Sequence, residues 1–134
     1  METNKLKGFG LKYSEAWCSQ NPESVAAFFA DNGSLKVNND PPAEGRNAIA
    51  KVAEGFMTAF PDMVVTMDNL MNTSKGTEFH WTLTGTNSGP GGTGKKVKVK
   101  GFELWKFDTD SFILESLGSF DAEEYNRQLI NGYE

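Results

Sequence analysis

The carboxyl group of Glu103 is the side chain in this sequence whose surroundings most favour acid–base chemistry. The segment Lys96–Phe107 alternates between polar and apolar residues, so an extended strand places Glu103 on the same apolar face as Trp105. An apolar environment disfavours the charged form of a carboxyl group and raises its pKa, which prepares the group to give or take a proton near neutral pH. The alternative for Glu103 is a structural role, either near the mouth of the pocket or in a salt bridge to Arg46 or a lysine.

Aromatic side chains recur along the chain at positions that favour one apolar pocket. Pockets for small molecules are lined mainly by hydrophobic side chains, with a few polar groups that fix the orientation of the ligand. Two polar side chains, Tyr13 and Asn39, are candidates to orient a ligand oxygen. The only histidine, His80, falls on the strand face opposite Trp81, so we expect it on the outer or interface face of the sheet and not in the pocket. The expected wall of the pocket consists of Trp17, Phe56, Phe60, Trp81, Trp105 and Leu117.

Three helices and then a series of strands must position these side chains. Apolar residues at spacings of three and four predict a first helix over residues 6–17. Asn21 favours the start of a second helix, because its side chain can cap free N–H groups, and Gly33 is expected to end it. A third helix is predicted over residues 46–60. Strands are predicted over residues 34–37, 63–72, 78–86, 96–107 and 112–120, and a last short helix over residues 122–129.

This order of elements is typical of one fold class. Helices that precede antiparallel strands form α+β domains, in which the helices pack on one face of a curved sheet. A chain of 134 residues has the usual length of one domain, and no linker, repeat or low-complexity segment divides it. We therefore predict a single domain over residues 1–134.

The charge and the residue types exclude several classes of function. The net charge of −5 argues against a nucleic-acid partner, because phosphate binding depends on clustered lysine and arginine. The lysines of residues 95–100 alternate with valines, which predicts a solvated outer face; a patch for an anionic ligand is the alternative. One histidine and one cysteine offer no metal site, and no motif for a cofactor is present. No segment resembles a signal peptide or a membrane span, so we expect a cytoplasmic location.

Short segments of the sequence, in a fixed order, resemble a SnoaL-like protein of the nuclear-transport-factor-2-like superfamily. Each segment alone is short, but together they extend over nearly the whole chain. The segments are GRNAI at the start of the third helix (45–49), FPD after it (60–62), GTNSGP at a strand end (85–90), TGKKV at the next strand start (93–97), and Asp121 with Gln128-Leu129.

The resemblance implies a cone-shaped α+β barrel, in which a mostly antiparallel sheet is wrapped around about three N-terminal helices and opens at one end into a pocket. It also implies a homodimer that pairs through sheet faces. SnoaL-like cyclases use an aspartate at the end of the last strand as general acid and base, and Asp121 holds the corresponding position. Strand alternation groups Asp121 with Ile113, Leu117 and Ser119, which is compatible with an inward position. The alternative role for Asp121 is the N-cap of the last helix.

The catalytic pattern of the family is incomplete in this sequence. Asn87 stands where the family has a histidine, and Ser116-Leu117 replaces the usual HW or EW pair on the last strand. Tyr13 is placed like the tyrosine that donates a hydrogen bond to the substrate oxyanion in ketosteroid isomerases. The aspartate base of those isomerases falls near Val37, which cannot take a proton.

Two functions of different class therefore stay open. In the first, the protein is a cofactor-free cyclase- or isomerase-like enzyme that acts on a hydrophobic, carbonyl-bearing small molecule, with Asp121 or Glu103 moving the proton. In the second, it binds a small apolar ligand in its pocket without catalysis.

Overall fold

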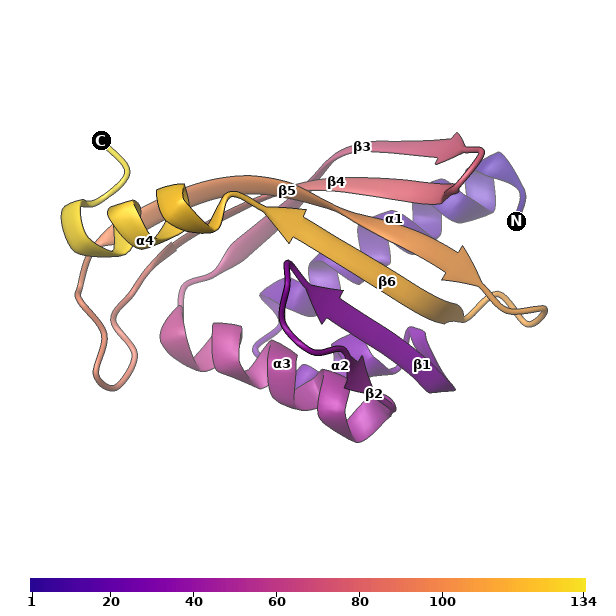
Figure 1. Cartoon of the computed structure of the whole chain (residues 1–134), viewed down its shortest axis with the longest axis horizontal. Coiled ribbons are helices and arrows are strands. Elements are labelled where there is room, and N and C mark those ends of the chain that lie inside the picture. Colours follow the sequence, from indigo (N-terminus) through magenta and orange to yellow (C-terminus); the bar gives the residue numbers. More distant parts are fainter.

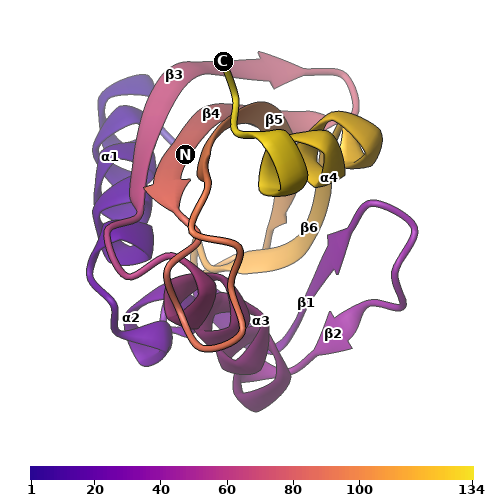
Figure 2. The same cartoon turned by 90° about the vertical axis from the view of Figure 1, so that its left-hand side faces the viewer.

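One strongly curved sheet organises the protein, and helices α1, α2 and α3 lie on its concave side (Figure 1). The structure is a computed structural model that describes residues 1–134. Seen along the strands, the sheet bends around these helices, and α4 lies across one end (Figure 2). The elements are α1 (Thr3–Cys18), α2 (Pro22–Ala26), β1 (Phe29–Val37), β2 (Ala43–Glu44), α3 (Arg46–Ala59), β3 (Val64–Thr73), β4 (Gly76–Thr86), β5 (Lys96–Phe107), β6 (Ile113–Phe120) and α4 (Ala122–Asn131).

The six strands form a single mixed sheet in the order β2-β1-β6-β5-β4-β3. Only the β1–β6 pair is parallel, and the other four pairs are antiparallel. The sheet does not close on itself, because β2 and β3 remain at its edges. The predicted α+β fold with a curved, mostly antiparallel sheet is confirmed.

Local sequence accounts for where the helices begin and end. The side chain of Asn21 accepts a hydrogen bond from the Glu23 N–H at 3.2 Å and so caps α2. Asp121 caps α4 in the same way, through the Glu124 N–H at 3.1 Å. Helix α3 ends before Pro61, which has no N–H to continue the helical hydrogen bonds. None of the helices has the length and apolar character that a membrane crossing requires.

The predicted end of the second helix at Gly33 is wrong. Helix α2 ends at Ala26, and Gly33 lies inside β1, which begins at Phe29. The pairing of β1 with β6 shifts register between Phe29 and Ser34. A Cβ atom on Gly33 would lie 2.9 Å from the Ile113 carbonyl oxygen, so this glycine permits the close approach of the two backbones.

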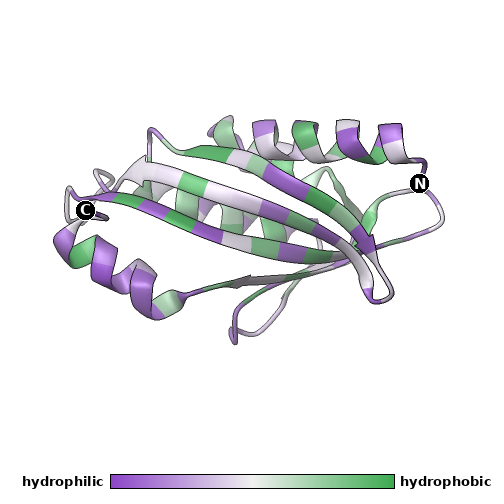
Figure 3. Cartoon of the chain, turned by 90° about the horizontal axis from the view of Figure 1, so that it is seen from above, coloured by the Kyte–Doolittle hydropathy of each residue, from purple (hydrophilic) through white to green (hydrophobic).

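The two faces of the sheet differ as the alternation of residues predicts. Hydrophilic and hydrophobic residues alternate along the strands (Figure 3). On β5, Val97, Val99 and Trp105 are buried, whereas the lysines at 96, 98, 100 and 106 are exposed. The inner face and the helices enclose a hydrophobic core of 19 buried residues.

An irregularity in β6 reverses the alternation that the sequence predicted for this strand. Lys106 of β5 pairs with Glu115, but the next residue pairs with Ile113, so Leu114 is an extra residue in the ladder. Ile113 and Ser116 are therefore both fully buried, while Leu117 is 38 % exposed. The predicted inward position is correct for Ile113 and wrong for Leu117, which lies on the outer face opposite Leu104.

Candidate functional site

A small apolar cavity lies between the inner face of the sheet and helices α1, α3 and α4. Its volume is about 60 Å³, and eleven of its 14 lining residues are hydrophobic. Glu103 is the only acidic residue in the lining, and the lining contains no lysine, arginine or histidine. The lining residues are Trp17, Leu35, Val37, Phe56, Val65, Phe79, Trp81, Leu83, Val99, Glu103, Gly118, Ser119, Phe120 and Tyr125.

The two oxygens of the Glu103 carboxyl group have different surroundings. Oε1 accepts three hydrogen bonds, from the Tyr13 hydroxyl at 2.8 Å, the Trp105 indole N–H at 2.9 Å and the Ser116 hydroxyl at 2.7 Å. Oε2 has no hydrogen-bond partner, and it is not fully enclosed, since Trp17 Nε1 is the only fully buried side-chain nitrogen or oxygen without a partner. The three donors fix the carboxyl group and leave Oε2 free for a molecule in the cavity.

The strand register brings these groups together. Glu103 and Trp105 are two positions apart on β5, so both point to the inner face. Ser116 is the β6 partner of Trp105, and Gly118 is the β6 partner of Glu103. A Cβ atom on Gly118 would lie 3.2 Å from the Lys36 carbonyl oxygen, which is a tight contact, and 3.8 Å from Glu103 Cγ, which is an ordinary one.

Burial dominates the electrostatics of Glu103. Removal from water disfavours the charged carboxylate and raises the pKa of Glu103 above its usual value of 4.5. The hydrogen bonds from Ser116, Trp105 and Tyr13 stabilise the carboxylate and oppose part of this rise. A carboxyl group with a raised pKa can exist in both protonation states at pH values where a surface glutamate is fully ionised, which suits proton transfer.

Tyr13 is a positioning residue that stays protonated. Burial, and next the negative charge of Glu103, raise the pKa of Tyr13 well above its usual value of 10.0. The Trp17 indole N–H lies near the phenol oxygen and acts in the opposite direction, lowering the pKa of Tyr13. The Tyr13 ring meets Phe79 and Trp105 edge to face at centroid distances of 5.3 and 5.0 Å. This packing holds the hydroxyl against Glu103.

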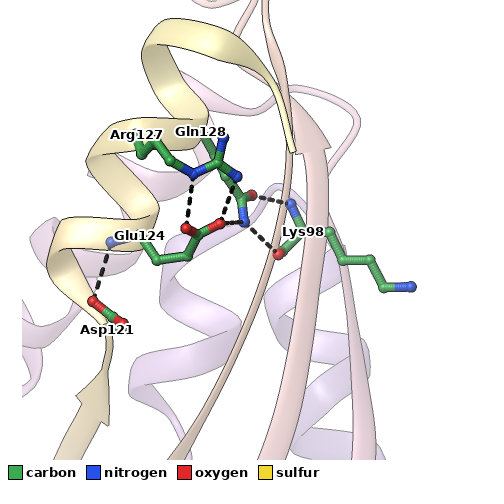
Figure 4. A network of polar contacts seen from close by, with 5 residues as sticks. All are labelled: Lys98, Asp121, Glu124, Arg127 and Gln128. Carbon is green, nitrogen blue, oxygen red and sulfur yellow. Dashed lines mark hydrogen bonds and ion pairs between the residues drawn. The ribbon is translucent and has the colours of Figure 1, made fainter. Parts of the chain in front are cut away.

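Helix α4 contributes part of the cavity wall. Its Tyr125 lines the cavity and packs against Phe120, with ring centroids 5.5 Å apart. Gln128 attaches the helix to β5: Nε2 donates to the Lys98 carbonyl oxygen at 3.0 Å, and Oε1 accepts from the Lys98 N–H at 2.7 Å (Figure 4). Because β6 pairs with β5 only from Gly101 onward, Gln128 takes the place of a neighbouring strand at this edge.

Most of the residues predicted to form the pocket lie around this cavity. Trp17, Phe56 and Trp81 line it together with Glu103. Tyr13 and Trp105 are fully buried, and both donate a hydrogen bond to Glu103. Phe60 is also fully buried but does not line the cavity; its ring packs against Tyr125 at 6.4 Å.

Three predicted site residues lie elsewhere. Asp121 is exposed and caps α4 through its side chain, outside the lining of the cavity. Asn39 is exposed in the turn after β1, and Leu117 points to the opposite face of the sheet because of the extra residue in β6. The alternative partner suggested for Glu103, Arg46, instead binds Asp31 at 2.6 Å.

Ser116 is the polar group that sequence reasoning missed. The sequence gives its position in a strand but not its face, because one extra residue upstream reverses the alternation. The indole N–H of Trp105 was also missed as a donor, since Trp105 was expected only as an apolar wall. A signal did exist for Trp105: residues two apart on a strand share a face, so its N–H and the Glu103 carboxyl group can meet.

The His80 ring lies away from this site, as predicted. Its Nε2 is 2.9 Å from Glu78 Oε1, and its ring stacks on Phe102 with centroids 5.4 Å apart. No three side chains of histidine, cysteine, aspartate or glutamate gather closely enough to hold a metal ion.

Comparisons with known proteins assign the family. The sequence pattern of the SnoaL-like polyketide cyclases matches residues 10–129. A comparison with curated proteins gives no match.

Solved structures share the fold at low sequence identity. A protein of Jannaschia sp. CCS1, assigned to the SnoaL-like polyketide cyclases, aligns with a TM-score of 0.81 and 18 % identity over 95 % of this chain and 92 % of that one. AclR of Streptomyces galilaeus, described as a candidate hydroxylase, aligns with a TM-score of 0.79 and 20 % identity over 96 % of this chain and 97 % of that one. A protein of Catenulispora acidiphila DSM 44928 with a ketosteroid isomerase-like fold was solved in complex with trimethylamine. It aligns with a TM-score of 0.71 and 15 % identity over 83 % of each chain. These similarities confirm the cone-shaped α+β fold.

Proposed function

Because the chain belongs to the SnoaL-like polyketide cyclase family, we propose that it binds a small apolar molecule with a carbonyl group and moves a proton on it through Glu103. No cofactor takes part in this reaction. The observation that carries the proposal is the arrangement of the Glu103 carboxyl group: Oε1 is held by three donors, while Oε2 is left without a partner in a cavity of apolar side chains.

The reaction that suits this arrangement is proton transfer next to a carbonyl group. Glu103 Oε2 takes a proton from the carbon beside the carbonyl, the C–H electron pair forms a C=C bond, and the carbonyl oxygen takes the negative charge. In a ligand with a C=C bond next to the carbon that loses the proton, return of the proton to the far carbon of that bond isomerises the ligand. When Glu103 first exchanges its proton for a deuteron from D₂O, return of the deuteron to the original carbon completes an exchange. The raised pKa of Glu103 brings its basicity closer to that of a group working near neutral pH.

The size of the cavity limits the ligand. A volume of about 60 Å³ is well below the roughly 300–1,000 Å³ of sites for drug-sized ligands. We therefore expect a ligand with one ring or a short chain, unless Tyr125 and α4 move outward. The complex of the Catenulispora protein with trimethylamine supports a small ligand in this fold.

Exchange of hydrogen for deuterium on simple ketones tests the proposal. Cyclohexanone and acetophenone are incubated with the protein in D₂O, and loss of the signal from the hydrogens beside the carbonyl is followed by proton NMR. We expect the protein to accelerate the exchange and Glu103→Gln to slow it by about 100-fold or more. The matched control is Glu115→Gln, which removes a carboxylate on the outer face, 3.8 Å from Lys106 Nζ.

Asp121→Asn serves as the second control. Because Asp121 caps α4 outside the cavity, its amide variant is expected to keep the exchange activity. If the exchange activity survives in Glu103→Gln and is lost in Asp121→Asn, the group that moves the proton is Asp121, and the role proposed for Glu103 is contradicted.

Ligand binding without catalysis is the second candidate function, and the apolar lining of the cavity favours it. In that case cyclohexanone shifts the NMR signals of cavity residues such as Trp17 and Trp81. The hydrogen–deuterium exchange of the ketone, however, is no faster with the protein than in buffer alone. The same two measurements therefore separate an enzyme from a binding protein.

We also propose that the protein forms a homodimer through the outer face of the sheet. A groove on this face is lined by apolar side chains, among them Phe102, Leu104 and Leu117. Leu117 is 38 % exposed, although it lies in the middle of a strand. Burial of such side chains against a second copy would stabilise the pair.

A further inference from the structure

When Glu103 is ionised, the cavity holds one negative charge and no positive one. The lining contains no lysine, arginine or histidine, so no cationic side chain neutralises the carboxylate. The three hydrogen bonds to Oε1 come from uncharged donors, namely a phenol, an indole and a hydroxyl. A carboxylate that is removed from water without a positive partner destabilises its surroundings. A ligand that carries a positive charge into the cavity would supply the missing partner.

The walls of the cavity suit the apolar part of such a ligand. Neighbouring rings meet at steep angles: the planes of Trp17 and Phe56 lie at 73°. The ring of Phe120 meets those of Trp81 and Tyr125 at 66° and 80°. Aromatic rings attract cations through their π electrons, and cages of such rings bind alkylated ammonium groups. The aromatic residues of the lining are Trp17, Phe56, Phe79, Trp81, Phe120 and Tyr125.

The hydrogen-bonding capacity of the cavity narrows the class of cation. Glu103 Oε1 already accepts three hydrogen bonds, and Oε2 is the carboxyl oxygen without a partner. A protonated tertiary amine has a single N–H, which one free acceptor satisfies. A primary ammonium group has three N–H groups, and most of the remaining lining is hydrophobic. Donors that lose water without gaining an acceptor weaken binding, so the site favours the tertiary ammonium ion.

We propose that the cavity binds a small tertiary ammonium ion, which donates its N–H to Glu103 Oε2 and packs its alkyl groups against the aromatic rings. This inference goes beyond the proposed function, because it needs no proton transfer to or from carbon and names a ligand of a different class. The contact is a charge-assisted hydrogen bond in apolar surroundings, the stronger kind of hydrogen bond in proteins. An amine and a ketone would use the same oxygen of Glu103, so they exclude each other.

A series of three cations with the same ring tests the inference. N-methylpyrrolidine, pyrrolidine and N,N-dimethylpyrrolidinium all carry a positive charge at neutral pH, but they have one, two and no N–H groups. Binding of each is followed by NMR on ¹⁵N-tryptophan-labelled protein, through the signals of Trp17 and Trp81 in the cavity wall. We expect N-methylpyrrolidine to bind about tenfold more tightly than either of the other two.

Two variants test the part of Glu103. Glu103→Gln removes the charge and places an N–H donor where the ion pair needs an acceptor, while its amide oxygen can still accept the three hydrogen bonds. We expect N-methylpyrrolidine to bind Glu103→Gln at least about tenfold more weakly. The matched control is Glu115→Gln, which removes a carboxylate on the outer face and should bind N-methylpyrrolidine as the wild type does.

The ion pair should also change the acidity of Glu103 in the wild type. Burial raises the pKa of Glu103, and a cation beside the carboxylate favours the charged form, so N-methylpyrrolidine should lower this pKa. Carbon-13 NMR of the glutamate carboxyl groups, recorded against pH with and without the amine, measures the change. Burial raises the pKa values of Tyr13, which is bonded to Glu103, and of Tyr125 in the cavity wall, so both stay protonated during this titration.

The outcomes separate this inference from the proposed function. If the three cations bind equally, or if Glu103→Gln binds N-methylpyrrolidine as the wild type does, the ion pair with Glu103 is overturned. If N-methylpyrrolidine does not bind at all, the whole inference is overturned, whereas ketone exchange can still be observed. If N-methylpyrrolidine binds selectively and no ketone is exchanged, the inference is supported and the proposed proton transfer is overturned.

Discussion

The hydroxyl of Tyr13 lies 2.8 Å from Glu103 Oε1, although 90 positions separate the two residues in the sequence. This hydrogen bond joins α1 to the centre of β5, in the interior of the protein. Since the phenol proton is engaged with Glu103, Tyr13 holds the carboxyl group in place and is not free to donate to a ligand. Tyr13 therefore resembles the oxyanion tyrosine of ketosteroid isomerases in its position, but its hydroxyl proton is bound to Glu103 and not to a substrate oxygen.

Removal of one donor should alter the acidity of Glu103. Ser116→Ala deletes the hydroxyl that lies 2.7 Å from Oε1 and has the largest stabilising effect of the three donors on the carboxylate. Because the carboxylate loses support while burial remains, we expect the pKa of Glu103 to rise further. Carbon-13 NMR of the glutamate carboxyl groups, recorded against pH, measures the change.

Ser74→Ala is the control for this titration, since Ser74 is exposed in the turn between β3 and β4. In the Ser116→Ala protein the ketone exchange should also need a higher pH, because less of Glu103 is ionised at neutral pH. A pKa of Glu103 that is unchanged or lowered in Ser116→Ala would contradict the role of this donor.

Burial of Glu103 should make the stability of the protein depend on pH. The folded protein holds the proton of Glu103 to a higher pH than the unfolded chain does, because its pKa is raised above 4.5 on folding. Below pH 4.5 the contribution of this group to the free energy of unfolding should therefore be fully present. The free energy of unfolding should fall as the pH rises from there through the pKa of the folded state. Urea denaturation at a series of pH values measures this fall.

Glu103→Gln should remove this part of the pH dependence, since glutamine does not titrate and its amide oxygen can still accept the three hydrogen bonds. Glu124 acts in the opposite sense. Hydrogen bonds from Arg127 lower the pKa of Glu124 from 4.5 to about 2, so the stability that it contributes is present above pH 4.5 and is lost as the pH falls from there through about 2. A stability profile that is the same in the wild type and in Glu103→Gln would argue against a buried, titrating Glu103.

Much of the fold followed from local signals in the sequence. The third helix, the strand at residues 96–107 and the inward face of Glu103 are where the residue spacing predicted them. Helical spacing and strict alternation are short-range patterns, and a single segment is enough to show them. The cap by Asp121 was also one of two stated alternatives.

The parts that the sequence did not reveal depend on contacts between distant segments. Gly33 lies in β1 at a point where β1 and β6 approach closely, and the residues around Gly33 do not reveal this approach. The face of Ser116 depends on one extra residue in the β5–β6 ladder. The hydrogen bond between Tyr13 and Glu103 requires the full packing of α1 against the sheet. Site geometry is set by tertiary structure, whereas helices and strands are set largely by local sequence.

A charged residue on the outer face of the sheet should separate the proposed homodimer. In Leu117→Asp, pairing of two copies would bury a carboxylate in the groove beside Phe102 and Leu104, at a high cost in desolvation. We expect size-exclusion chromatography with light scattering to give a dimer for the wild type and a monomer for Leu117→Asp. The control is Leu11→Asp, which places the same charge on the exposed side of α1, where Leu11 is 46 % exposed.

Gln128 should control both the attachment of α4 and the closure of the cavity. Gln128→Ala leaves the N–H and the carbonyl oxygen of Lys98 without their partners at the edge of β5 (Figure 4). We expect the free energy of unfolding to fall by about 1–3 kcal/mol and the amide protons of α4 to exchange faster with solvent.

Asn126→Ala is the matched control, because Asn126 is exposed on the same helix and makes no side-chain hydrogen bond to β5. Looser attachment of α4 also frees Tyr125 from the cavity wall, so Gln128→Ala should admit larger ketones than cyclohexanone. Hydrogen–deuterium exchange measured by mass spectrometry follows the helix, and ketone binding by NMR follows the cavity. If the amide protons of α4 exchange faster but the largest ketone that binds stays the same, Tyr125 does not set the size limit of the ligand. The limit then lies with Phe56, Trp81 and Phe120.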